Sequence, residues 1–336
     1  MLVDGGVGGD LRVIPDHARE LEALGYDGLI SAETSHDPFF PLLFAASSTE
    51  RVQLSTGIAV AFARNPMVLA QIANDVQTYS QGRFALGLGS QIKAHIEKRF
   101  SMPWSQPAAR MREFVLAMRA IWESWNERTK LDFRGEFYSH TLMTPFFDPG
   151  PNPFGPPKVY LAAVGPHMIE VAGEVCDGLI AHPLTSEKYM RESIIPTVGR
   201  GLAKVGKTLE AFDISLPAFL VTGDTEEDMA AAVDGIKQQI AFYGSTPAYR
   251  VVLDAHGWGD MQPELNRLSK EGRWVEMGAL IDDDVVDVFA VQGTPEELPA
   301  KVIARYGDVV DRVSFYAPYH LDPDRWRAVL AGFKAD

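Results

Sequence analysis

Cysteine is almost absent from this sequence, which excludes disulfide bonds as a source of stability. Cys176 is the single cysteine in 336 residues, so no disulfide can form within the chain. A chain of this length buries enough apolar surface to fold without such cross-links. A lone thiol also fits a reducing compartment. We therefore expect a soluble, cytoplasmic protein that is held together by its core alone.

Long apolar runs and an excess of basic residues are also lacking. No stretch of 18 or more apolar residues occurs, which argues against a membrane-spanning helix. Acidic residues outnumber basic ones by 45 to 31, and the formal net charge is −14. This charge disfavours binding to nucleic acids and to anionic membrane surfaces. The acids and glycines of residues 1–11 do not resemble a signal peptide. The expected partner is a small-molecule substrate.

Several catalytic motifs are missing as well. The eight histidines form no HExxH motif and a single cysteine cannot form CxxC, so we expect no metal site. No GxSxG motif of a serine hydrolase is present. Residues 86–91 (LGLGSQ) supply two glycines of a dinucleotide-binding fingerprint, but Ile92 stands at the third glycine position. A Rossmann-type dinucleotide site is therefore disfavoured.

What the sequence does contain is a regular alternation of short apolar runs and helical patterns. Apolar strands that alternate with helices predict a parallel sheet, and eight such units favour a closed (β/α)8 barrel, a TIM barrel. We expect one domain over residues 1–336. The expected strands are Met1–Asp4, Gly25–Glu33, Val52–Ala61, Arg83–Gly89, Val159–Val164, Gly178–His182, Ile214–Val221 and Arg312–Tyr316.

Two stretches do not fit the repeat, and we interpret them as insertions. One spans about residues 90–157, after the fourth strand, and the other about residues 241–292, after the seventh. Both follow strands and so are expected at the end of the barrel where such enzymes hold their sites. Among the helices, the spacing predicts one from about Leu11 to Leu24 and one near Met67–Tyr79.

Two histidines follow predicted strands and are therefore expected at the barrel mouth. His36 lies just past the second strand, and His182 lies at the end of the sixth. Glu33 and Asp37 neighbour His36 and are placed to orient or tune it as an acid or base near neutral pH. A hydrogen-bonded structural role is the alternative for each histidine.

Two further segments are candidates for ligand binding. Gly89, Ser90 and Gln91 end the fourth strand, where tight turning and the support of a flat cofactor are alternative roles. Val164, Gly165 and His167 surround the start of a predicted helix with Pro166 in its first turn. Proline is favoured there for capping reasons alone, whereas a helix N-terminus at a barrel mouth can also bind a phosphate.

Taken in order, five segments resemble the luciferase-like monooxygenase superfamily, and within it the oxidoreductases that use the deazaflavin coenzyme F420. They are AETSHDPF (32–39), STGIAVAFARNPMVLA (55–70), SQGRFALGLGSQ (80–91), FRGEFY (133–138) and YLAAVGPHMIEVAGEVCDGLI (160–180). The resemblance covers nearly the whole chain and implies a TIM barrel with insertions.

The resemblance also implies a cofactor site. It places the flat ring at the barrel mouth against a bulge of the third strand that often contains a cis non-proline peptide. Further contacts are implied at the ends of the fourth and fifth strands. The residues that match are Ile58, Ala59, Val60, Gly89, Ser90, Gln91, Ala162, Ala163, Val164, Gly165 and His167.

By the same resemblance His36 stands beside the ring and transfers a proton to or from the substrate. Related enzymes often have an acid directly before this histidine, where this sequence has Ser35. We therefore expect hydride transfer between F420 and a small organic substrate. An FMN-dependent monooxygenase that needs a separate flavin reductase is one alternative, and a non-catalytic coenzyme-binding barrel is another. Family members are often dimers, so a homodimer is expected.

Overall fold

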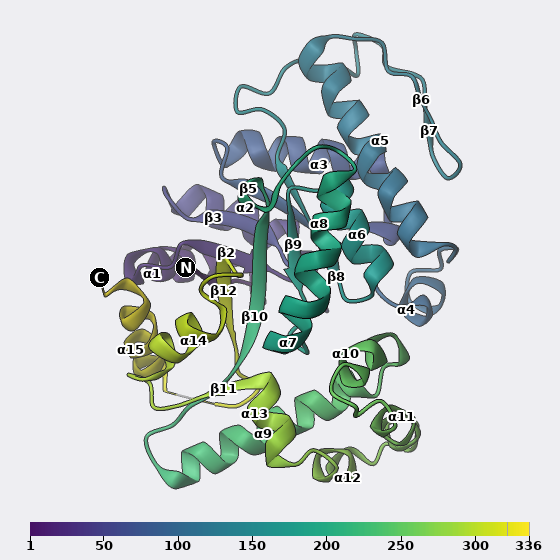
Figure 1. Ribbon diagram of the computed structural model, residues 1–336. Helices are drawn as coiled ribbons and strands as arrows, with labels where there is room; N and C mark the ends of the chain where they lie inside the picture. Colours follow the sequence, from purple (N-terminus) through teal and green to yellow (C-terminus); the bar gives the residue numbers. More distant parts are fainter. Residues whose placement is uncertain (321, 336) are drawn as a thin grey trace.

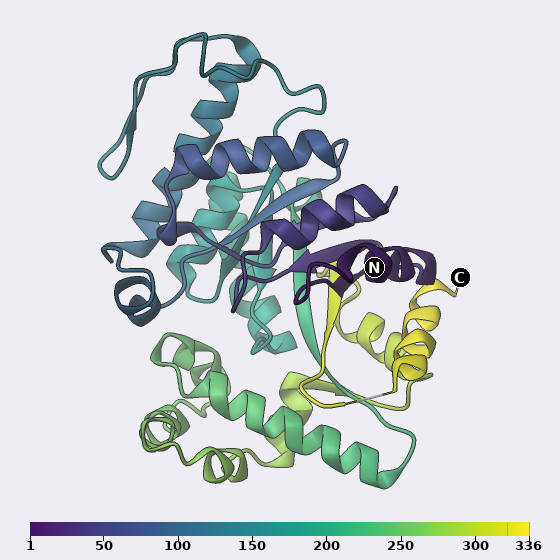
Figure 2. The same ribbon diagram turned by 180° about the vertical axis from the view of Figure 1, so that it is seen from behind.

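Eight parallel strands close into a barrel at the centre of the protein. The computed structural model describes residues 1–320 and 322–335. Strand β10 closes the ring because it pairs with both β9 and β12, which confirms the predicted TIM barrel (Figures 1 and 2). In order around the barrel the strands are β1 (Leu2–Gly6), β2 (Gly28–Ser31), β3 (Gln53–Thr56), β5 (Phe84–Gly89), β8 (Lys158–Ala163), β9 (Gly178–Ala181), β10 (Asp213–Val221) and β12 (Arg312–Tyr316).

Amphipathic helices surround these strands. In α1, Ile14, Ala18 and Leu21 are buried at helical spacing. This helix begins at Ile14 rather than at the expected Leu11, with Pro15 in its first turn, where a missing N–H costs nothing. The helices that follow or flank the strands are α1 (Ile14–Leu24), α2 (Phe39–Ser48), α3 (Pro66–Tyr79), α6 (Pro166–Val175), α7 (Glu187–Tyr189), α8 (Ile195–Ala203), α14 (Leu298–Tyr306) and α15 (Pro323–Lys334); a π-helical turn, Met190–Ile194, joins α7 to α8.

Long excursions follow β5 and β10. The first carries α4 (Lys93–Lys98), α5 (Pro107–Glu127) and a hairpin of β6 (Phe133–Arg134) and β7 (Ser139–His140). The second carries α9 (Glu226–Gly244), η4 (Pro247–Tyr249), α10 (Arg250–Asp254), α11 (Met261–Glu271), α12 (Trp274–Ala279), α13 (Asp283–Phe289) and β11 (Ala290–Gln292). In both views α9–α13 form a group of their own at the end of the barrel where β10 leads into α9 (Figures 1 and 2).

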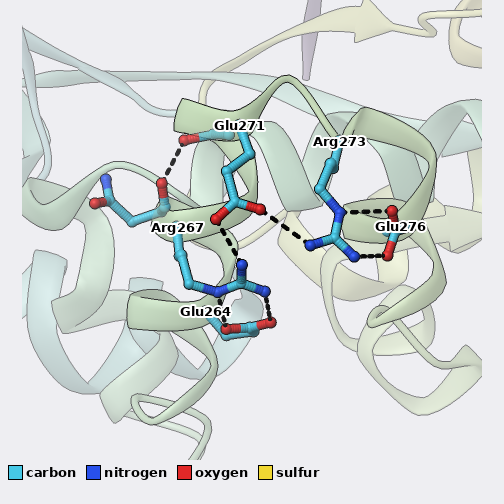
Figure 3. A network of polar contacts seen from close by, with 7 residues as sticks. Glu264, Arg267, Glu271, Arg273 and Glu276 are labelled. Atoms are coloured by element: carbon cyan, nitrogen blue, oxygen red, sulfur yellow. Dashed lines mark hydrogen bonds and ion pairs between the residues drawn. The ribbon is translucent and has the colours of Figure 1, made fainter.

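Arginine–glutamate pairs line the surface where α11 meets α12. Gly272, with a φ of 70°, breaks the helical stretch there. Arg267 binds Glu264 and Glu271, and Arg273 binds Glu271 and Glu276 (Figure 3). These side chains are exposed, so solvent screens their attraction and they fix the corner more than they stabilise the fold.

The third strand is interrupted by a bulge, as the family resemblance implied, whereas the strand pattern alone predicted one strand over Val52–Ala61. Residues 53–56 form β3, residues 59–60 form β4, which pairs with β5, and the Gly57–Ile58 peptide between them is cis. A side chain at position 57 would lie 2.4 Å from Ile30 Cγ2. Glycine is therefore needed where this bulge passes close to β2.

A buried ion pair lies inside the barrel at the N-terminal ends of the strands. Arg312 donates to both carboxylate oxygens of Asp4, and the two residues are 8% and 4% exposed. The pair fills the space beside Gly28, where a Cβ atom would lie 2.3 Å from Asp4 Oδ1. Removing charge from one partner leaves the other buried and incompletely paired.

We therefore expect Asp4→Asn to lower the free energy of unfolding by about 1.5–3 kcal/mol, the range for hydrogen bonds to charged groups. Urea denaturation of wild type and variant measures it. Asp10→Asn, which removes the acid of the exposed Asp10–Arg12 pair, is the matched control and should leave the midpoint unchanged. Equal midpoints for all three proteins would contradict this role of Asp4.

Among the described residues no helix is both long enough and apolar enough to cross a membrane. Cys176 is buried, and its burial raises the pKa of the thiol to about 12.

Candidate active site

Half-buried residues lie towards the C-terminal ends of several barrel strands. In β2 and β9 every residue is buried except Ile30 and Ile180, which are half-buried. Ser55 and Ala162, their partners in the strand register, are half-buried in the same way. Register partners on neighbouring strands point to the same face of a sheet. Ile30 therefore shares a face with Ser55, and Ile180 shares a face with Ala162. Solvent therefore reaches a mostly apolar floor at the mouth, where TIM-barrel enzymes place their sites.

The strand order divides the rim of this mouth into two arcs. Around the barrel, β3, β5 and β8 are consecutive, and β9, β10 and β12 follow them. The first arc holds all the cofactor contacts that the resemblance implied. The second arc begins with His182, directly after β9. Strand β2, which leads to His36, lies four positions from β9 in either direction, so the two histidines follow opposite strands.

On the His36 side, an arginine organises the loop after β2. Arg64 Nη1 lies 2.6 Å from Glu33 Oε2, and Nη2 lies 3.0 Å from Asp37 Oδ2. Glu33 is 9% exposed and also accepts a 2.7 Å hydrogen bond from the Val60 amide. One carboxylate thus ties the loop after β2 to the residues after the cis peptide.

This arrangement corrects the sequence interpretation of both acids. Glu33 and Asp37 were expected to orient His36, but both bind Arg64 instead. His36 itself is exposed at the tip of the loop, and within the described residues its side chain makes no hydrogen bond. From the sequence alone Arg64 had no assigned role in the site. Arg64 lies 31 residues from Glu33 and 27 residues from Asp37 in the chain, so no short sequence pattern predicts these ion pairs.

The bulge and the end of β5 fit closely together. A Cβ atom on Gly89 would lie 2.8 Å from both Cγ1 and Cδ1 of Ile58. Ile58 is half-buried at the mouth, whereas Ala59 and Val60 are fully buried. After Gly89 the chain turns through half-buried Ser90 and Gln91, and Gln91 has a φ of 56°. Glycine at 89 is what allows Ile58 its present position.

Next to this, the end of β8 leads directly into α6. Ala162, Val164 and Gly165 are half-buried, Ala163 is 5% exposed, and Gly165 is the N-cap of α6. The Val164 carbonyl accepts a hydrogen bond from the Tyr189 hydroxyl. The side chain of His167 instead lines a groove of about 360 Å³ between α5 and α6, with residues that include Arg112, Glu174 and Lys204.

Aromatic side chains line the opposite arc of the mouth. We call this cluster the aromatic wall, and it consists of His182, Phe219, Tyr243, Tyr249 and Tyr316. The His182 ring lies 4.4 Å from that of Tyr243 and 4.2 Å from that of Tyr249. Phe219 and Tyr316, which pair in the register of β10 and β12, lie 5.2 Å apart. Tyr243 and Tyr249 come from α9 and η4, so the second excursion completes this side of the mouth. Of these five residues only His182 was a candidate from the sequence. Tyr243 and Tyr249 lie in an insertion, where no periodic pattern marks them.

One motif in the sequence has a phosphate-loop spacing but not its structure. Residues 201–208 read GLAKVGKT, which fits GxxxxGK[ST]. Such a loop joins a strand to a helix, whereas Gly201 lies inside α8. A Cβ there would lie 2.2 Å from the Glu170 carbonyl oxygen of α6, so this glycine serves close packing of α6 and α8. Among the described residues no group of three or more His, Cys, Asp or Glu side chains could hold a metal ion.

The fold and the open, strand-end site define a TIM-barrel enzyme, and comparison with known proteins places it in a family. The luciferase-like monooxygenase model matches residues 2–312, and the chain belongs to that family. An uncharacterized protein of Mycobacterium tuberculosis is 53% identical over 311 residues, 93% of this chain and 92% of that protein. A 5,10-methylenetetrahydromethanopterin reductase of Archaeoglobus fulgidus is 29% identical over 269 residues, 78% of this chain and 75% of the reductase.

Solved structures share the fold. The coenzyme F420-dependent tetrahydromethanopterin reductase from Methanopyrus kandleri aligns with a TM-score of 0.78 at 19% identity, over 98% of this chain and 96% of its own. A type II Baeyer–Villiger monooxygenase from Pseudomonas putida, in complex with FMN, aligns with a TM-score of 0.66 at 15% identity, over 96% of this chain and 92% of its own. At these identities the likeness establishes the architecture alone.

Proposed function

We propose that this protein is an F420-dependent oxidoreductase that exchanges a hydride between the coenzyme and a small organic substrate. The observation that supports it most is the continuity of the implied coenzyme contacts. They follow three neighbouring strands, β3, β5 and β8, beside an open apolar floor. Two names support the same reaction class. The Archaeoglobus fulgidus relative is named as a methylenetetrahydromethanopterin reductase, and the Methanopyrus kandleri structure as an F420-dependent tetrahydromethanopterin reductase.

The residues present suit a flat ring with a phosphate-bearing tail. Half-buried Ile58 and Ala162 offer apolar contact to a ring, and half-buried Gly165 carries no side chain that would obstruct its approach. At the start of α6, Pro166 has no N–H and the Met168 and Ile169 amides donate to the Gly165 carbonyl. Among the described residues the His167 amide has no acceptor, and it is the first-turn donor left for a phosphate. F420, when bound, supplies a ring carbon that donates or accepts hydride. The chain's own task is to hold ring and substrate in contact and to handle one proton.

We assign the proton to His36. It is an exposed imidazole on the loop that Arg64 braces through Asp37. An imidazole can both donate and accept a proton, which suits transfer in either direction. Arg64 acts here as a positioning residue, because its contacts hold the loop and the bulge rather than a ligand.

The alternative is an FMN-dependent monooxygenase that works with a separate flavin reductase. The FMN complex among the structural neighbours favours it. A barrel that binds the coenzyme without turnover is a third reading, which no contact in the site favours. Cytoplasmic location and a homodimeric state stay predictions from the sequence.

Parallel fluorescence titrations with F420 and FMN distinguish the two cofactors. We expect saturable binding of F420 at micromolar concentration or tighter, and binding of FMN at least tenfold weaker. The reasons are the structural neighbour named for F420 and the apolar contact that Ile58 and Ala162 offer to a ring. Tight binding of FMN with none of F420 would overturn the proposal and support the monooxygenase. Binding of F420 with no oxidation of its reduced form by any substrate tried would favour the non-catalytic barrel.

A further inference from the structure

The aromatic wall differs in charge from the rest of the mouth. The loop after β2, on the opposite side, contains Glu33 and Asp37, and Arg64, which follows β4, binds both acids. In the wall, burial alone lowers the pKa of His182 to about 3 and raises the pKa of Tyr249, and no charged side chain contributes to either shift. The pKa of Tyr243 is raised by burial and then by its hydrogen bond to Tyr316, again without a charged neighbour. At neutral pH this side of the mouth is therefore uncharged.

The hydrogen bonds of the wall leave donors available. The Leu184 amide donates to His182 Nδ1 at 3.1 Å, so the proton of the neutral ring resides on Nε2. Within residues 1–320 and 322–335 nothing accepts a hydrogen bond from that Nε2. The Tyr243 and Tyr316 hydroxyls lie 2.7 Å apart, and only one of their two protons is used between them. His182 Nε2–H and one tyrosine hydroxyl proton are therefore donors without an acceptor in the described residues.

The exposed surface of the wall is aromatic. Tyr243, Tyr249 and Tyr316 are half-buried, whereas Phe219 behind them is 1% exposed. Half-buried rings at an otherwise buried site are surfaces on which another ring can pack. An anionic group placed here would be desolvated without a cation to pair with it, which is costly. The wall thus suits a ligand that is flat, uncharged and equipped with a hydrogen-bond acceptor.

We propose that the aromatic wall is the substrate-specificity surface, and that it binds an uncharged cyclic or aromatic ketone, or the corresponding alcohol, with His182 Nε2–H donating to its oxygen. The inference rests on the proposed function, since it takes this compound to be the hydride partner of F420. It places the substrate between β9–β12 and the coenzyme arc of β3–β8. His182 is a positioning donor in this assignment, and proton transfer stays with His36.

Two substitutions separate the two nitrogens of His182. Asparagine can place an oxygen where Nδ1 now accepts from Leu184 but has nothing at the Nε2 position. Glutamine can place an amide N–H near the Nε2 position. Isothermal titration of the full chain with acetophenone, with and without F420, measures binding directly. We expect His182→Asn to weaken binding about 5- to 10-fold, the equivalent of one hydrogen bond, and His182→Gln to weaken it less.

Controls test the charge argument and the fold. His17→Asn, on the exposed surface of α1, should bind acetophenone like wild type. The anion 4-acetylbenzoate carries the same ketone and should bind at least tenfold more weakly than acetophenone. Equal binding by wild type and His182→Asn, equal binding of the anion, or no binding of acetophenone in either state would overturn the assignment. Acetophenone binding without any F420 binding would instead refute the proposed coenzyme and leave the wall as a ligand surface.

Discussion

Replacing Glu33 by alanine is expected to lower the free energy of unfolding by about 3–5 kcal/mol, the cost of breaking a buried ion pair from one side. The carboxylate accepts from the Val60 amide and from Arg64 at 2.7 and 2.6 Å. Without it, a buried backbone N–H and a guanidinium that is 15% exposed lose their shared partner. The residues after the cis peptide and the His36 loop are then no longer joined, so F420 binding should weaken as well.

Urea denaturation measures the loss of stability, and the F420 titration measures the loss of the site. Glu33→Gln keeps one oxygen as an acceptor and should lie between wild type and alanine in both measurements. Glu20→Ala removes the acid of an exposed pair with Arg327 and serves as the control, with no expected change. An alanine variant at position 33 that unfolds at the wild-type urea concentration would show that the pair does not hold the mouth together.

Replacing His36 by asparagine is expected to lower turnover by about 100- to 10,000-fold, the usual contribution of a positioned acid or base. The side chain is exposed and makes no hydrogen bond among the described residues, so stability and F420 affinity should stay within twofold of wild type. The assay is oxidation of reduced F420 with a cyclic ketone as the hydride acceptor.

The pH profile gives this prediction a second readout. Proton transfer by His36 should give the wild-type rate a pH dependence that His36→Asn lacks. His17→Asn is again the control. Turnover of His36→Asn within twofold of wild type, with an unchanged pH profile, would remove His36 from the mechanism.

Much of the fold could be predicted because it follows local rules. Apolar runs such as residues 214–221 were recognisable as strands, since both faces of a barrel strand are buried. The capping box of Thr225 and Asp228 at the start of α9 is a pattern of the same local kind. The interruption of the third strand was implied by the family resemblance, whereas the pattern of Val52–Ala61 alone predicted one strand. The approach of Gly57 to Ile30 at this break is a tertiary contact, which the local pattern does not report.

The site was only partly predictable for the same reason. The segments near the mouth follow strands directly, so Ile58, Gly89 and Val164 could be placed from their positions in the chain. Arg64 meets Glu33 across a separation of 31 residues, and Tyr243 meets Tyr316 across 73. Spacing in the sequence carries no information on such pairs. They emerge once the barrel brings the strand ends together and the second excursion covers one side.

The most direct test of the central claim, that F420 binds on the β3–β5–β8 arc, compares its dissociation constant for wild type, Gly89→Ala and Gly199→Ala. An added methyl group at position 89 would lie 2.8 Å from Ile58, whereas at position 199 in α8 it meets nothing within 4 Å. Displaced Ile58 would occupy the space assigned to the ring. We predict at least tenfold weaker F420 binding for Gly89→Ala and unchanged binding for Gly199→Ala. Wild-type affinity in a folded Gly89→Ala protein would contradict the account.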